Sequence, residues 1–175
     1  MPRAIFHPTG SSIFLSGRAP FHYTYDVQSG RVARSHHGIW GGIRAGGQNG
    51  KDIEVSSLEI SKFSADGKIL AVGGKHGYIH LVDWTGSLGG GQIIGNMKMN
   101  AAIKDLCWAG EDKLMSIGMD SEVYLWDVGS RRCVSRWKDD GAFSPNLLEG
   151  SAKGDYYAIG CVIRLRLTWD VTDFE

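Results

Sequence analysis

The sequence repeats one unit four times, and this repetition constrains the fold more than any other feature. Each unit has an apolar segment, a polar turn with glycine, a second apolar segment, another turn, and a third segment that closes on an aspartate. The closing aspartates are Asp26, Asp83, Asp127 and Asp170, with intervals of 57, 44 and 43 residues. A period of about 40–45 residues made of short strands is typical of a WD40-type β-propeller.

The repeat predicts an all-β fold, a partial WD40-type propeller of about four blades that forms one domain over 1–175. We place the blades near 4–33, 58–85, 103–128 and 147–171. The longer first interval holds a glycine-rich insertion at 34–57. The 25 glycines, about twice the usual share, indicate many tight turns.

Strands are predicted from side chains that alternate between two faces. In "EVYLWD", Val123, Leu125 and Asp127 face one side, whereas Tyr124 and Trp126 face the other. No stretch of about 11 residues or more spaces its apolar side chains at the helical period of about 3.6. We therefore expect few helices.

The third unit resembles the sequence pattern of a hydrogen-bond network found in WD-repeat families. In those families, a buried Trp on the third strand bonds a Ser or Thr on the second strand, and an Asp in the intervening turn supports it. Ser116, Asp120 and Trp126 stand at the matching places, and Asp127 completes the Trp-Asp pair. A buried indole N–H needs an acceptor, so we interpret these residues as structural rather than catalytic.

The other units keep less of this pattern. The His that precedes the first strand is missing from the third unit, where "MKMN" occupies its place. In the second unit, Val72, His76 and Val82 stand where Ser, Asp and Trp are expected. We therefore expect that unit to be held together without the Trp network.

Motifs for catalysis or for cofactor binding are not found. Around "GGQNGKD", Ala45 stands where a phosphate-binding loop has its first glycine, and Asp52 stands where that loop has its hydroxyl residue. The adjacent His36 and His37 cannot both easily face one metal ion, and we expect them in a solvated loop. No zinc motif or nucleophile elbow occurs. We predict no enzymatic activity, cofactor, metal site or small-molecule substrate.

Charge and hydropathy limit the classes of partner. The 19 basic and 19 acidic side chains cancel, so no overall field attracts the chain to nucleic acid or to a membrane surface. No apolar run approaches the ~20 residues that a membrane-spanning helix needs. The three cysteines are widely spaced, which argues against a disulfide framework.

One basic cluster is a candidate contact surface. Arg131, Arg132, Arg136 and Lys138 fall on the expected outermost strand of the third unit and on the turn before it. Charges on an edge strand commonly block aggregation. They also suit contact with RNA phosphates or with an acidic partner. Both interpretations stay open.

Four segments in order resemble the U3 small nucleolar RNA-associated protein 18 family. They are "FHPTG" with "SGRAPFHYTYDVQSGRV", "SLEISKFSADGKILAVGGKHGYIHLVDW", "GNMKMNAAIKDLCW", and "LMSIGMDSEVYLWDVGSRRCVSRWKDDG". The insertion "HHGIWGG" also stands where that family has a loop. The resemblance covers about residues 4 to 160.

This resemblance implies a scaffold without catalytic residues. Members are WD-repeat subunits of the nucleolar small-subunit processome, in which other WD-repeat proteins, U3 small nucleolar RNA and pre-ribosomal RNA assemble. They act in processing towards 18S ribosomal RNA. The resemblance thus implies a nuclear, nucleolar location.

The chain departs from that family in two ways. Members have a full propeller after a long polar region, whereas this chain starts inside the propeller, so we expect a fragment of it. The tail "CVIRLRLTWDVTDFE" does not resemble the family, and Val162-Ile163 is a poor turn sequence. We expect either a degenerate fourth unit or an unrelated tail.

A different class of function is a WD40 substrate adaptor of a cullin-type ubiquitin ligase, or another generic protein-interaction propeller. Such adaptors often carry an Arg two residues after the Trp-Asp pair. Here Val128 and Gly129 follow Asp127, and the basic pair begins only at Arg131. The adaptor therefore stays the alternative to the scaffold.

Overall fold

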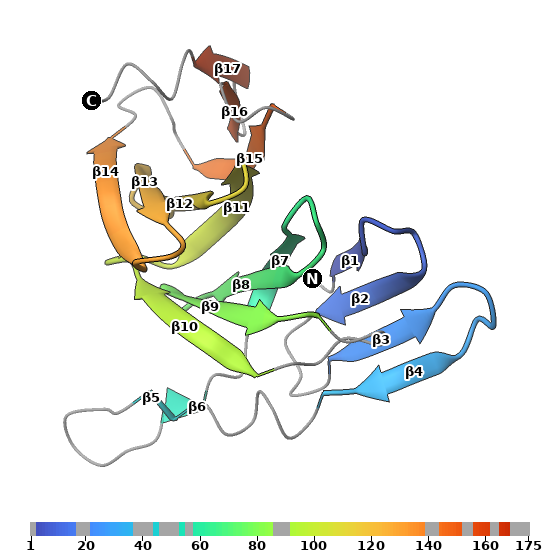
Figure 1. Cartoon of the computed structure of the whole chain (residues 1–175). Helices are drawn as coiled ribbons and strands as arrows, with labels where there is room; N and C mark the ends of the chain where they lie inside the picture. The colour runs from blue at the N-terminus through green and yellow to red at the C-terminus, as the bar shows by residue number, and fades with distance from the viewer. Residues whose placement is uncertain are drawn as a thin grey trace.

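The computed structural model describes residues 3–16, 22–36, 44–45, 53–54, 58–85, 92–138, 144–151, 156–161 and 165–168. All regular structure in these residues is β, and no helix occurs among them. The strands form successive antiparallel sheets in a partial WD40-like propeller that does not close into a barrel (Figure 1). The predicted fold class is confirmed.

The first two sheets each have four strands in chain order. The first contains β1 (Arg3–Phe6), β2 (Ser12–Ser16), β3 (Tyr23–Asp26) and β4 (Val32–Ser35). The second contains β7 (Leu58–Phe63), β8 (Ile69–Gly74), β9 (Tyr78–Asp83) and β10 (Ile93–Lys98). Between them lies a short pair, β5 (Arg44–Ala45) with β6 (Ile53–Glu54).

The third and fourth sheets repeat this order. The third contains β11 (Ile103–Ala109), β12 (Lys113–Gly118), β13 (Glu122–Asp127) and β14 (Arg132–Lys138). The fourth contains β15 (Pro145–Gly150), β16 (Tyr157–Cys161) and β17 (Leu165–Thr168). Neighbouring sheets meet through their first strands, since β7 contacts β1 and β11, and β11 contacts β15.

The sheets extend past the unit ends expected at 85 and 128. The fourth strand of the second sheet ends at Lys98, and that of the third sheet ends at Lys138. These fourth strands are the outer strands of their sheets. Each follows the closing aspartate of its unit, Asp83 or Asp127, which begins the turn into the outer strand. In the first sheet, β4 already occupies the start of the expected insertion at 34–57. Asp170 lies outside the described residues.

The first three strands of the third sheet are largely buried on both faces because a sheet packs on each side of them. Tyr124 and Trp126 pack with residues of the second sheet such as Leu81. Val123 and Leu125 belong to another cluster, which includes residues of the fourth sheet. The alternation in "EVYLWD" therefore separates two apolar layers rather than an apolar face and a polar one.

An aromatic layer joins the first and second sheets. Phe14 of β2 packs edge-on against Trp84, with ring centroids 5.5 Å apart, and His36 lies 5.5 Å from the same indole. His36 is fully buried, and its Nε2 lies 2.7 Å from Oγ1 of Thr24. The expectation of a solvated loop is thus wrong for His36, because the residue that follows β4 turns inward. His37 lies outside the described residues.

Acidification is expected to destabilise the protein through His36. Burial, followed by the charges of Arg34 and His22, lowers the pKa of His36 from 6.5 to about 4. A depressed pKa means that the folded state binds fewer protons than the unfolded chain between these values. The stability that the buried, neutral His36 contributes is complete above pH 6.5 and is lost as the pH falls towards 4. The unfolding free energy should decrease by about 2 kcal/mol between about pH 7.5 and pH 5.

Urea unfolding of the wild type and of His36→Gln over this pH range measures the effect. His80 also has a pKa lowered by burial, so part of the acid sensitivity is expected to persist in the variant. The His36 contribution is the difference between the two pH profiles. Parallel profiles would show that His36 does not control acid stability.

Candidate partner interface

The first strands of the four larger sheets, β1, β7, β11 and β15, are the inner strands of the fold. Charged side chains connect these strands to one another. Asp105 of β11 is fully buried, and its Oδ1 lies 3.2 Å from Nη1 of Arg3 on β1. Its other oxygen accepts the backbone N–H of Leu148 on β15 at 2.8 Å. One carboxylate therefore connects the first, third and fourth sheets.

A second set of contacts links the second sheet to its neighbours. Lys62 of β7 forms an ion pair with Glu149 of β15 at 2.8 Å. The carbonyl of Lys62 accepts the indole N–H of Trp108 on β11 at 3.2 Å. The ion pair is partly exposed and contributes little by itself. Together with the apolar layers, these contacts connect the first strands of the second, third and fourth sheets.

The structure joins two of the four predicted network residues directly. The indole N–H of Trp126 donates to Oγ of Ser116 at 2.8 Å, and both side chains are buried. Tyr124 stacks on Trp126, with ring centroids 5.3 Å apart and planes within 9°. This arrangement satisfies the buried indole N–H and fixes the middle of the third sheet.

Asp120 and Asp127 shape turns on either side of β13. Asp120 accepts the backbone N–H of Glu122 at 3.2 Å in the turn that enters β13. Asp127 accepts the backbone N–H and the hydroxyl of Ser130 in the turn that leaves it. These bonds from Ser130, the side-chain bond first, lower the pKa of Asp127.

The closing aspartates of the first two units have the same role, which the sequence analysis missed. Asp26 accepts the backbone N–H of Ser29 at 2.6 Å, and Asp83 accepts that of Thr85 at 2.9 Å. The signal was present, because a Ser or Thr follows each of these aspartates by two or three residues. Such side-chain turns direct the chain into the outer strand.

Apolar packing and a histidine replace the Trp network in the second sheet. Val72 and Val82 are fully buried and pack with Leu70. His80 of β9 is also buried, and its Nδ1 lies 2.7 Å from Oδ1 of Asn96 on β10. The second sheet is therefore held without a Ser–Trp pair, as the sequence predicts.

The basic cluster lies on β14 and on the turn before it. All four side chains are exposed. The strand register pairs Arg136 with Tyr124 and Lys138 with Glu122, which places both cations on the face towards the second sheet. A bulge next to Trp126 shifts this alternation, so that Arg132 pairs with Asp127 on the opposite face.

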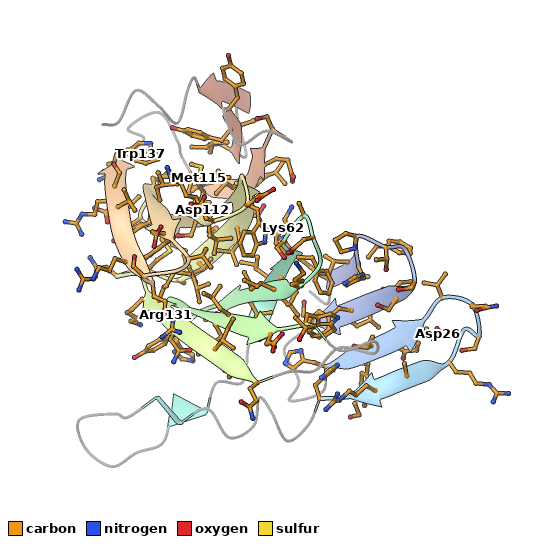
Figure 2. The ribbon with its side chains drawn as sticks, viewed as in Figure 1. Asp26, Lys62, Asp112, Met115, Arg131 and Trp137 are labelled. Atoms are coloured by element: carbon orange, nitrogen blue, oxygen red, sulfur yellow. The ribbon has the colours of Figure 1, made fainter. Side chains whose placement is uncertain are left out.

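Arg131 extends the cluster to the second sheet. It adopts a positive φ of 59° in the turn, and its side chain lies against Gly95 of β10, where a β-carbon would collide with it. Figure 2 shows Arg131 and Trp137 near opposite ends of β14. The guanidinium of Arg136 lies 6.0 Å from the ring centroid of Tyr124. Arg131, Arg136 and Lys138 therefore form one strip, which we name the outer basic strip.

One acidic residue offsets part of the charge of this strip. Glu122 stands opposite Lys138 in the register, whereas Asp127 pairs with Arg132 on the other face. Because the chain carries no net charge, the strip does not attract RNA over a long range. It can form local charge-assisted bonds with phosphates or carboxylates.

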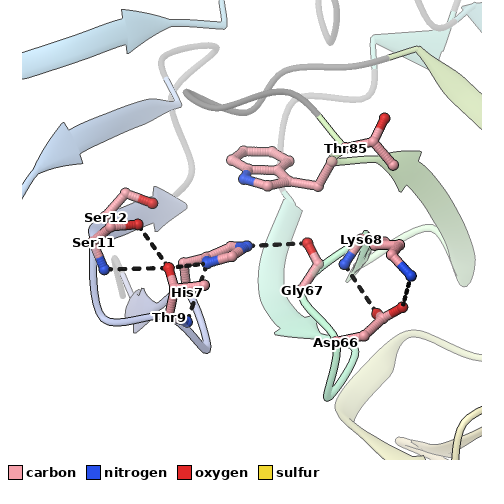
Figure 3. Close-up of a pocket in the computed structure, with 9 residues that line it drawn as sticks. His7, Thr9, Ser11, Ser12, Asp66, Gly67, Lys68 and Thr85 are labelled. Carbon is pink, nitrogen blue, oxygen red and sulfur yellow. Dashed lines mark hydrogen bonds and ion pairs between the residues drawn. The ribbon is translucent and has the colours of Figure 1, made fainter.

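A polar seam closes the junction of the first and second sheets (Figure 3). His7 bridges them, with Nδ1 2.7 Å from Oγ1 of Thr9 and Nε2 3.1 Å from the carbonyl of Gly67. Asp66 pairs with Lys68 at 3.1 Å. The polar groups around this cavity of about 260 Å³ thus bond largely to one another, which suits a joint between sheets.

The described residues contain no group of three or more side chains suited to hold a metal ion. Among the same residues, no helix is long and apolar enough to cross a membrane.

No protein-family model matches this chain. The U3 small nucleolar RNA-associated protein 18 homolog of Arabidopsis thaliana is 31% identical over 159 residues, which is 90% of this chain. The resemblance to the U3 small nucleolar RNA-associated protein 18 family is confirmed. The human homolog is 29% identical, and the probable Schizosaccharomyces pombe member 26% identical, each over 90% of this chain.

The chain spans about a quarter of the length of these relatives. It covers 26% of the Arabidopsis and human members of the U3 small nucleolar RNA-associated protein 18 family, and 28% of the S. pombe protein. The name shared by these relatives associates them with U3 small nucleolar RNA.

Proposed function

We propose that this chain is a non-catalytic WD40 scaffold of the small-subunit processome, acting in the nucleolus in pre-ribosomal RNA processing towards 18S ribosomal RNA. Its partners are other WD-repeat subunits, together with U3 small nucleolar RNA and pre-ribosomal RNA in the same complex. The observation that carries the proposal is the similarity, over 90% of the chain, to relatives named for their association with U3 RNA.

The structure supports a scaffold in two respects. Apolar layers and buried polar contacts join each sheet to the next, so loops on different sheets keep fixed relative positions. The outer basic strip of Arg131, Arg136 and Lys138 also lies on regular strand and turn structure, which holds its charges at defined positions. Rigid elements that present exposed charges suit simultaneous contact with several partners.

Affinity purification of the tagged chain from nucleoli tests this function. We expect U3 RNA and nucleolar WD-repeat proteins to be recovered with it. Recovery of cullin-type ligase subunits without U3 RNA would favour the adaptor instead.

The same purification tests the outer basic strip. We expect Arg136→Glu/Lys138→Glu to reduce recovery of U3 RNA about fivefold or more, because charge-assisted bonds to phosphates or carboxylates become repulsive. Arg31→Glu/Lys68→Glu is the matched control, since both side chains are exposed and lie in turns of the first and second sheets. Equal recovery with the two double variants would exclude a role for the strip.

A further inference from the structure

A second surface, separate from the outer basic strip, lies where the four inner strands begin. A cavity of about 280 Å³ is lined by the first residues of β1, β7, β11 and β15 and by two turns. Arg3, Ile60, Ile103 and Asn146 come from the four strands. The four larger sheets therefore all contribute to this one site, which we name the inner-strand cavity.

The base of the inner-strand cavity is apolar and its walls lie on fixed turns. Ile60 and Ile103 are almost fully buried. Met119, in the turn between β12 and β13, leaves 61% of its surface exposed. Its backbone N–H donates to the carbonyl of Ala102 at 2.9 Å, which fixes this turn beside the start of β11. An exposed methionine on a fixed turn offers an adaptable apolar contact.

The charged side chains of the cavity leave a small positive excess. Arg3 is already paired with the buried Asp105. The remaining cations are Lys75, which is exposed, and Lys104, which is half-buried. Glu59 supplies the one remaining negative charge among the described residues that line the cavity. This arrangement suits one or two carboxylates beside an apolar side chain.

The same features disfavour nucleic acid as the occupant. No aromatic ring is among the described residues that line the cavity, whereas single-stranded nucleic acid binds largely by stacking on such rings. The volume is near the lower end of the roughly 300–1,000 Å³ of ligand sites, so it admits a short segment and no folded domain.

We propose that the inner-strand cavity binds an extended peptide segment of a partner protein, in which an apolar side chain is flanked by acidic ones. The apolar side chain contacts Met119 and the apolar base. The acidic side chains pair with Lys75 and Lys104. This binding is independent of U3 RNA and goes beyond the scaffold function proposed above.

Fluorescence anisotropy with the complete chain tests the proposal. The probe is a labelled peptide of about ten residues that carries Asp-Leu-Asp in a Gly-Ser background. A peptide with Lys-Leu-Lys and an oligouridine of similar length are the comparison probes. We expect the acidic peptide to bind, and Lys75→Glu/Lys104→Glu to weaken its binding about tenfold or more.

Two further variants separate charge from apolar contact. Arg31→Glu/Lys68→Glu has the same change in net charge and is expected to alter binding less than about twofold. Met119→Ser should weaken binding about threefold or more without a change in charge. Equal thermal unfolding of all variants establishes that they are folded.

The proposal is overturned if the acidic peptide does not bind, or if both double variants weaken it equally. Tighter binding of oligouridine, lost in Lys75→Glu/Lys104→Glu, would assign the cavity to RNA instead. Neither result depends on recovery of U3 RNA from nucleoli, so the scaffold function can fail or hold separately.

Discussion

Replacing Trp126 with alanine is expected to lower the free energy of unfolding by about 3–5 kcal/mol. The indole lies in the apolar layer between the second and third sheets, 4% exposed and stacked on Tyr124. Its removal leaves a cavity that the flanking β-sheets cannot easily fill, because both are fixed by their own hydrogen bonds. Urea denaturation followed by circular dichroism measures the loss.

The hydrogen bond from Trp126 to Ser116 is tested by a double-mutant cycle. Ser116→Ala leaves the indole N–H without its acceptor in a buried site, a loss of about 1–3 kcal/mol. In Trp126→Phe the N–H is absent, so adding Ser116→Ala should then have a much smaller effect. Strict additivity of the two substitutions would show that the bond does not stabilise the sheet.

The sequence repeat was enough to predict the successive sheets because it depends on interactions between residues that are close in the sequence. Apolar alternation specifies the strands, and an aspartate followed by a Ser or Thr specifies the turn that ends the third strand. The outer strands β10 and β14 were less evident, since exposed residues such as Ile94 and Val134 alternate with polar ones and provide no clear apolar face. Their place follows from the turn at Asp83 or Asp127 rather than from their own composition.

Features that depend on contact between distant segments could not be predicted in the same way. His36 stands among glycines and polar residues, yet the aromatic layer of Phe14 and Trp84 buries it. The division of the basic cluster between two faces depends on a bulge beside Trp126, which sequence alternation cannot reveal. In contrast, the Ser116–Trp126 bond joins neighbouring strands, so spacing along the chain was enough to indicate it.

Asp105 was missed although its position carried a signal. It lies on a largely apolar strand and on the same face as Cys107, where an acidic side chain is unexpected. Its partners stand 102 and 43 residues away in the sequence, at Arg3 and Leu148. A buried acid in an apolar strand indicates a specific partner, but only the folded chain shows which one.

Asp105→Ala is therefore expected to destabilise the protein by about 2–4 kcal/mol, because the substitution leaves the buried N–H of Leu148 without an acceptor and Arg3 without its partner. The fourth sheet should loosen first, since the Leu148 bond attaches it to the third. Hydrogen exchange at Leu148 and Ile159, compared with exchange in the second sheet, measures this local effect alongside urea denaturation.

Asp105→Asn separates the backbone bond from the charge. The asparagine can still accept from Leu148, but it carries no charge to bury. Burial is the main influence on the pKa of Asp105 and raises it, although the bond from Leu148 acts in the opposite direction. The folded state therefore holds the proton to a higher pH than the unfolded chain, and the wild type loses stability as the pH rises through the folded pKa.

The asparagine variant should accordingly stay within about 1 kcal/mol of the wild type at neutral pH, and its relative stability should increase as the pH rises from about 4 to 7. If the variant is instead as unstable as Asp105→Ala at neutral pH, the ion pair with Arg3 contributes more to stability than the backbone bond from Leu148. The junction of the first, third and fourth sheets would then depend on charge, and its stability should decrease as salt is added.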